Sequence, residues 1–137
     1  MRKRLLVVTG ALLGALLLSA VLIALFGTVS LSVKEADAAG AVLTLQNITL
    51  AELTYGADYS LEQLVDGEWV EMEPQLENFA FAAVGYSLPS LFRKTIPVDW
   101  ETVYGKLAEG DYRLVKQIRI GDTTRRLTAA FHVPGQT

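Results

Sequence analysis

The sequence predicts an all-β fold: an antiparallel β-sandwich of seven to eight strands, preceded by one N-terminal hydrophobic helix. From Ala41 onward, short runs of alternating apolar and polar residues are separated by turn residues, with almost no helical periodicity. Before that point, Leu5–Phe26 forms a run of twenty-two residues without a charge. The chain has 137 residues, so about a hundred remain after the apolar segment, which suits one domain.

The apolar segment is expected to be a membrane anchor. Arg2, Lys3 and Arg4 precede Leu5–Phe26, and this run suits a span of about 20 residues better than a signal-peptide core of about 7–15. An alternative is that a signal peptidase recognises the small-x-small pattern at Ala36–Ala38 and cleaves the chain near Ala38, so that the domain is secreted. In both cases the basic residues stay in the cytoplasm and the C-terminal domain lies outside the cytoplasmic membrane.

The resulting organisation has four parts: residues 1–33 as membrane anchor or uncleaved signal segment, 34–40 as linker, 41–133 as the β-sandwich and 134–137 as a tail. Gly10 and Gly14 form a G-x-x-x-G spacing within the anchor, which allows close approach of two helices. A weak homodimer through these glycines is therefore a minor prediction.

The strands follow from the alternating runs, and turn residues separate them. Asp66-Gly67 predicts a type I′ hairpin turn, and Gly121-Asp122 predicts a second hairpin near the C-terminus. Asp99–Tyr104 is expected to be a short helical turn capped by Asp99, and Pro97 places its strand near a sheet edge or strand end. The expected strands are Val42–Ile48, Leu50–Tyr55, Tyr59–Val65, Glu68–Met72, Phe79–Val84, Phe92–Val98, Asp111–Ile120 and Arg126–Val133.

The segment Leu107–Tyr112 indicates which kind of sandwich this is. A Leu, a Gly at 110 and then Tyr112 at the start of a long strand have the layout of a tyrosine corner, in which the phenol bonds back to the preceding loop. This predicts an immunoglobulin-like sandwich, although the Cys-Trp-Cys pattern of antibody domains is absent. The core is expected to include Leu45, Leu53, Leu61, Tyr112, Leu114 and Phe131.

Two longer segments resemble a known family. Tyr59–Trp69, which reads YSLEQLVDGEW, and Tyr104–Lys116, which reads YGKLAEGDYRLVK, are similar to a family of bacterial Ig-like domains found in secreted and membrane-attached proteins of Firmicutes. The similarity covers roughly Leu43 to Val133 and departs from the family pattern at Leu88–Phe92. It implies the fold, and it implies no common activity.

Composition narrows the possible functions. The chain has no cysteine, which excludes disulfides, thiolate metal sites and cysteine nucleophiles. After residue 4, nine basic and fifteen acidic residues give a net charge of −6. Ten acids lie between Glu35 and Glu77 without any Lys or Arg among them, and eight basic residues lie between Arg93 and Arg126. This argues against nucleic acid and against anionic lipid headgroups as partners, and predicts surface patches of opposite sign.

Candidate catalytic and metal-binding residues are few. His132 is the only histidine and is expected to face solvent. The carboxylate pairs Glu71/Glu73 and Asp99/Glu101 show no sign of a pocket, and the turn at Asp66–Glu68 lacks the further ligands of a calcium loop. We therefore predict no enzyme activity, no cofactor and no metal.

Two groups of residues are candidate binding surfaces. The first is an aromatic platform for sugars, although its tryptophans are expected to serve as core or sheet-corner anchors instead. Its members are Tyr55, Tyr59, Trp69, Tyr86 and Trp100. The second is the basic end of the last hairpin, where Lys116, Arg119, Arg125 and Arg126 are expected to be solvated.

The predicted function is a membrane-tethered, extracytoplasmic binding or structural module that contacts another envelope protein. One alternative is a carbohydrate-binding module for cell-wall or host glycans. A weaker alternative is an accessory domain of a membrane peptidase or sensor system.

Overall fold

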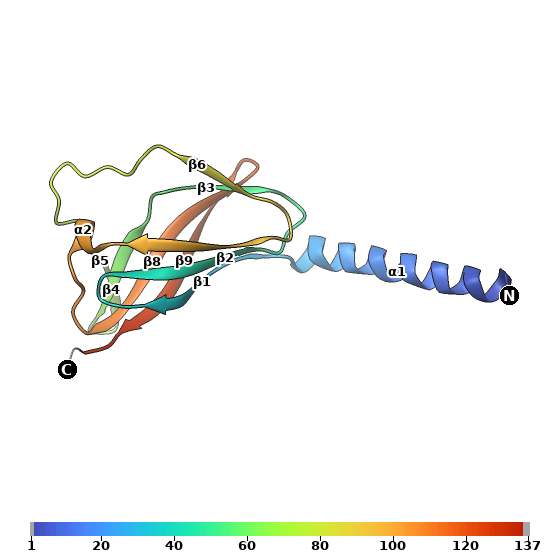
Figure 1. Ribbon diagram of the computed structural model, residues 1–137, viewed down its shortest axis with the longest axis horizontal. Coiled ribbons are helices and arrows are strands. Elements are labelled where there is room, and N and C mark those ends of the chain that lie inside the picture. The colour runs from blue at the N-terminus through green and yellow to red at the C-terminus, as the bar shows by residue number, and fades with distance from the viewer. Residues whose placement is uncertain (1, 136–137) are drawn as a thin grey trace.

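The computed structural model describes the backbone of residues 2–135 and the side chains of residues 9–23 and 27–135. An N-terminal helix leads directly into a β-sandwich, which carries one short helix at its far end (Figure 1). The elements are α1 Arg2–Phe26, β1 Val29–Ala36, β2 Gly40–Asn47, β3 Leu53–Gly56, β4 Ser60–Val65, β5 Glu68–Glu71, β6 Gly85–Leu88, β7 Arg93–Asp99, α2 Glu101–Tyr104, β8 Gly110–Ile120 and β9 Thr123–Val133.

Two antiparallel sheets form the sandwich, as the sequence predicts. The smaller sheet has the order β1-β2-β7. In the larger sheet, β8 is the central strand, and β9 pairs with one of its edges along its whole length. Both β4 and β3 pair with the other edge of β8. Next to them, β5 pairs with β4 and β6 pairs with β3. The break between β3 and β4, at residues 57–59, lies beside the middle of β8.

The core between the sheets contains the predicted residues. Leu45, Leu53, Leu61 and Leu114 are fully buried, and Phe131 is half-buried against them. Tyr112 is 2% exposed and its hydroxyl donates to the carbonyl oxygen of Ala108 at 2.9 Å, which confirms the tyrosine corner.

The predicted start of the domain at residue 41 is wrong. Val29–Ala36, which was assigned to the anchor and linker, is strand β1 and pairs with β2 along its length. Val29 and Leu31 are buried in the core, because alternate residues of β1 face inward. Only Gly27 and Thr28 join α1 to the first strand.

The predicted strand at Phe79–Val84 is also wrong. These residues belong to an irregular loop, residues 72–84, and the strand that pairs with β3 begins after it, at Gly85. The alternation of apolar residues in this loop reflects packing of Phe79 against the core and of Phe81 against Tyr59, and not ladder pairing. With β1 added, the described chain has nine strands instead of seven or eight.

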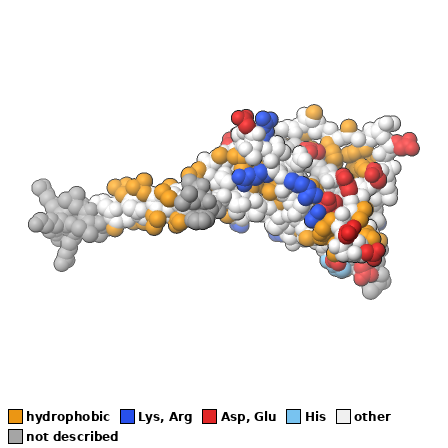
Figure 2. Space-filling model, turned by 180° about the vertical axis from the view of Figure 1, so that it is seen from behind, with side chains coloured by type: hydrophobic (Ala, Val, Ile, Leu, Met, Phe, Trp, Pro, Cys, Tyr) orange, Lys and Arg blue, Asp and Glu red, His pale blue; other side chains and the backbone are white. Residues whose placement is uncertain are grey.

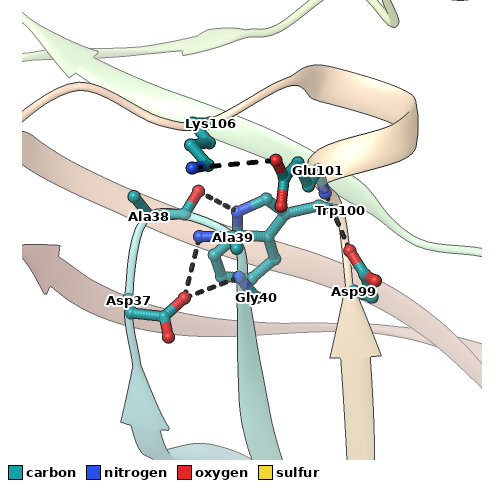
Figure 3. Close-up of polar contacts among 8 residues, drawn as sticks. All are labelled: Asp37, Ala38, Ala39, Gly40, Asp99, Trp100, Glu101 and Lys106. Atoms are coloured by element: carbon teal, nitrogen blue, oxygen red, sulfur yellow. Dashed lines mark hydrogen bonds and ion pairs between the residues drawn. The ribbon is translucent and has the colours of Figure 1, made fainter.

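The predicted helical turn after β7 is present and is drawn in Figure 3, but it covers Glu101–Tyr104 and its N-cap residue is Trp100 instead of Asp99. The N–H of Glu101 donates to Asp99 Oδ1 at 3.0 Å, so Asp99 satisfies one of the free donors at the start of α2 (Figure 3). Asp37 has the same role in the β1–β2 turn, where its carboxylate accepts from the N–H groups of Ala39 and Gly40.

No helix in the described part of the structure is both long and apolar enough to cross a membrane. The predicted span Leu5–Phe26 lies partly outside that part, since the side chains of residues 1–8 and 24–26 are not described. Gly10 and Gly14 are exposed, with open space where a Cβ atom would lie. Their role in a homodimer stays a prediction.

Candidate functional site

A groove of about 530 Å³ opens between the two sheets, on the side where β7 is the edge of the smaller sheet. Loop 72–84 borders it opposite β7, and the core residues Leu43 and Leu114 lie at its base. Its volume is in the range of small-molecule and side-chain binding sites. The sequence alone gave no indication of it.

Five aromatic residues line the groove. Tyr55 on β3 and Tyr86 on β6 are cross-strand partners whose rings stack at 5.3 Å between centroids. Tyr59 packs against Phe81 at 5.0 Å, and Phe81 meets Phe79 edge to face at 4.9 Å. The lining is therefore mostly apolar, and its aromatic residues come from β3, the β3–β4 connection, loop 72–84 and β6.

Lys116 lies at the base of the groove and is only 4% exposed. Its ammonium donates to the carbonyl oxygens of Gly56 at 2.7 Å and Asp58 at 2.9 Å. Both residues lie at the break between β3 and β4, and neither pairs with β8. The Tyr55 ring lies 5.3 Å from the same nitrogen. Burial lowers the pKa of Lys116, and the nearby Asp58 opposes this shift.

Tyr59 connects the two sheets across one end of the groove. Its hydroxyl donates to the carbonyl oxygen of Asp99 at 3.4 Å. Burial raises the pKa of Tyr59 to about 12, with smaller contributions from Tyr104 and Asp99. The phenol therefore stays protonated and acts as a hydrogen-bond donor at neutral pH.

The edge of β7 along the groove has free backbone groups. Pro97 has no N–H, so its pairing with Val42 is of the type without hydrogen bonds. Hydrogen-bonded and non-hydrogen-bonded pairs alternate along the ladder with β2, so every second residue of β7 directs its N–H and carbonyl away from β2. These residues are Arg93, Thr95, Pro97 and Asp99. The hydrogen bond from Tyr59 to the Asp99 carbonyl agrees with this. Thr95 thus offers both an N–H and a carbonyl to the groove.

Of the five residues predicted as a sugar platform, the three tyrosines come together and the two tryptophans do not. Tyr55, Tyr59 and Tyr86 line the groove, but Trp100 is 0% exposed and its indole N–H donates to the Ala38 carbonyl at 3.0 Å (Figure 3). Trp69 lies on β5, where the Arg113 guanidinium lies 4.6 Å from its ring centroid. Trp100 is a core anchor, as the sequence predicts, and neither tryptophan contributes to the groove.

The candidate catalytic residues lie on the surface. His132 Nδ1 lies 2.9 Å from Asp111 Oδ1 on the neighbouring strand, and both side chains are exposed. Glu71 and Glu73 are exposed. Within residues 2–135, no group of three or more histidine or acidic residues could hold a metal ion.

The prediction that Lys116 is a solvated residue of the basic hairpin end is wrong. It lies in the inward-facing row of β8, between the buried Leu114 and Ile118. This signal was present in the sequence, because a lysine at every-second-residue spacing within an apolar row faces the core. Phe79 and Phe81 had no such signal, because their place depends on how loop 72–84 crosses the sandwich.

Comparison with known proteins gives the family and two structures of similar fold. A family model described as a bacterial Ig-like domain matches residues 27–132. No curated protein matches. The archaellum periplasmic stator protein FlaG from Sulfolobus acidocaldarius aligns over 76% of this chain and 100% of its own, at 14% identity and a TM-score of 0.42. The ASH/PapD-like domain 7 of human CEP192 aligns over 80% of this chain and 87% of its own, at 11% identity and a TM-score of 0.36.

Proposed function

Because the chain belongs to the family of bacterial Ig-like domains, we propose that it is a membrane-tethered, extracytoplasmic binding module without catalytic activity. We further propose that its groove receives an extended segment of another envelope protein. The observation that carries this proposal is the aromatic groove lying directly along the free edge of β7.

The proposed tether is α1. In the described part of this helix, residues 9–23, apolar side chains on all sides are exposed, including Leu12, Leu13, Leu18 and Leu22. A helix that packed against the domain would bury one apolar face. Because the domain does not cover these side chains, we infer that they contact a different apolar environment. Lipid would provide it, and the basic residues Arg2–Arg4 would remain on the cytoplasmic side.

The proposed binding mode is strand addition to β7. An extended peptide can pair with the N–H and carbonyl of Thr95, and successive peptide side chains then point alternately into and away from the groove. The aromatic lining favours an apolar side chain at that place. Pro97 restricts the added strand, because it offers a carbonyl but no donor.

A substitution at Thr95 tests this binding mode. Thr95→Pro removes the outward N–H without removing a bond to β2, and Thr95→Val keeps the N–H as the matched control. A photo-crosslinking amino acid at Tyr86 in the full-length chain, expressed in bacterial cells, should capture a partner with the parent and with Thr95→Val. Capture by Thr95→Pro should be strongly reduced.

The outcomes separate the alternatives. Equal capture by all three variants would mean that the partner does not pair with β7. Binding of glycans that depends on Tyr86 and not on Thr95 would favour the carbohydrate-binding alternative. A membrane peptidase or sensor protein as the captured partner would assign the chain to that system.

A further inference from the structure

Exposed apolar residues gather on two loops at the end of the domain where α1 enters. We name residues 48–50 and 89–92 the helix-proximal loops. The first belongs to the connection from β2 to β3, and the second connects β6 to β7. Phe92 is 62% exposed and Leu91 57%, and Ile48 and Leu50 are exposed beside them. Four large apolar side chains at one end of a small domain indicate a surface that is covered in use.

Asn47, which is buried, links the two helix-proximal loops, and Ser90 Oγ adds a direct hydrogen bond to the carbonyl oxygen of Thr49. The side-chain amide of Asn47 donates to the carbonyl oxygens of Ala51 at 2.8 Å and of Leu88 and Pro89 at 3.2 Å each. Its backbone N–H donates to Phe92 at 2.9 Å, so it contacts both loops. The apolar side chains are therefore presented on a fixed framework and not on a loose loop.

The connection to α1 fixes the position of this surface. Gly27 continues the helix with a hydrogen bond from its N–H to Ile23, and the N–H of Ile48 donates to Thr28 at 2.9 Å. A Cβ atom at Gly27 would collide with the backbone of Ile48 and Ile23, so the joint is closely packed. If α1 ends at the membrane surface, the helix-proximal loops lie at the same level.

Basic side chains also gather at the end of the domain nearer α1. On the face seen in Figure 2, Lys and Arg side chains lie mostly on the half of the domain nearer the helix, and Asp and Glu mostly on the far half. Arg93 and Lys94 follow directly after Phe92 and are exposed. The net negative charge of the domain therefore does not prevent this end from approaching anionic headgroups.

We propose that the helix-proximal loops insert into the outer interface of the bilayer that holds α1, so that the domain lies against the membrane in a fixed orientation. This inference rests on the proposed tether. The bilayer is the occupant indicated by the two-residue connection and by the basic side chains next to the loops. Phe92, Leu91 and Leu50 are the inserted side chains.

The absence of cysteine makes the inference directly testable. Phe92→Cys and, as matched control, Leu76→Cys are made in the full-length chain and labelled with a fluorophore whose emission depends on polarity. Leu76 is also an exposed apolar loop residue, at 43%, but it follows Gln75, which bonds to Val103 in α2 at the far end of the domain. Both proteins are reconstituted into vesicles of phosphatidylethanolamine and phosphatidylglycerol.

We expect the label at position 92 to shift to shorter wavelength on reconstitution, to be quenched by spin-labelled lipid and to be protected from iodide. The label at position 76 should show none of these changes. Iodide access at position 92 in a chain that resists alkaline extraction from the vesicles would overturn the inference and leave the tether intact. Protection from iodide without quenching by lipid, together with energy transfer between labelled copies, would overturn it in favour of a second copy. A chain that alkaline treatment extracts from the vesicles would overturn both proposals.

Discussion

Removing one hydroxyl group, in Tyr112→Phe, should measurably destabilise the domain. The hydroxyl lies in a buried environment and donates to the Ala108 carbonyl at 2.9 Å. Phenylalanine keeps the ring, which stacks on Phe131 at 5.8 Å, but leaves that carbonyl without its donor. The expected cost is about 1–3 kcal/mol, the penalty for an unsatisfied buried group.

Tyr112→Ala should cost more, because it also leaves a cavity beside the ring column. Phe131 stacks on Tyr112 on one side and on Trp100, at 5.1 Å, on the other. The expected cost is roughly 3–5 kcal/mol, close to the whole stability of a small domain. This variant should be largely unfolded.

Urea unfolding of residues 27–137, followed by tryptophan fluorescence, measures both effects. The fragment has to begin before Val29, because β1 contributes Val29 and Leu31 to the core. With a urea dependence of about 1–3 kcal/mol per molar, Tyr112→Phe should lower the midpoint by roughly 1 M. Tyr86→Phe removes a hydroxyl from an exposed ring and serves as the control, with an expected change within about 0.5 kcal/mol. An unchanged midpoint for Tyr112→Phe would refute the role given to the tyrosine corner.

Three further predictions concern the turns, the loops and the charged surface. Gly67→Ala should lower the free energy of unfolding in urea by about 1–2 kcal/mol, because φ at Gly67 is +81°. Gly85→Ala is the control and should cost less than about 0.5 kcal/mol, because a Cβ atom there meets nothing within 4 Å. Asn47→Ala should cost about 1–3 kcal/mol in the same assay, because the carbonyls of Leu88 and Pro89 lose the side-chain donor and Ala51 keeps only its bond from Thr49. A neutral effect would contradict the role of Asn47 in holding the helix-proximal loops. The hydrogen bond from Arg113 is the main cause that lowers the pKa of Glu62. The ionised Glu62 therefore stabilises the folded domain above its ordinary pKa of about 4.3, and this stabilisation is lost as the pH falls through the lowered pKa. The urea midpoints of the parent and of Glu62→Gln should therefore converge when the pH is brought below the lowered pKa of Glu62. A difference that does not change with pH would contradict the contribution of ionised Glu62 to stability.

The local signals in the sequence were sufficient for most of the β-structure. Asp66 and Gly67 have φ values of +50° and +81°, as the predicted I′ turn requires, because only residues that tolerate positive φ fit there. The long terminal hairpin formed as expected, since strict alternation determines which residues face inward. The tyrosine corner was visible for the same reason: it depends on residues close together in the chain.

The predicted boundaries failed where the outcome depended on distant partners. Val29–Ala36 follows an apolar run so closely that it was read as part of the anchor and linker, and only its pairing with β2 makes it a strand. Phe79–Val84 has the alternation of a strand but finds no edge to pair with, since β3 pairs with Gly85–Leu88 instead. Strand assignment depends on such ladder partners as much as on local propensity.

The sequence by itself determined the class of fold, the family, the turn positions and the lack of cysteine chemistry, because these depend on residue types and short-range spacing. Only the tertiary structure decided the groove, the carbonyl partners of the Lys116 ammonium and the apolar end beside α1. The groove joins Tyr55, Phe81 and Thr95 from three distant segments, and the helix-proximal loops meet through Asn47 and through the hydrogen bond from Ser90 to Thr49. Their chemistry arises from contacts between residues far apart in the chain, which depend on the packing of the two sheets and not on any local pattern.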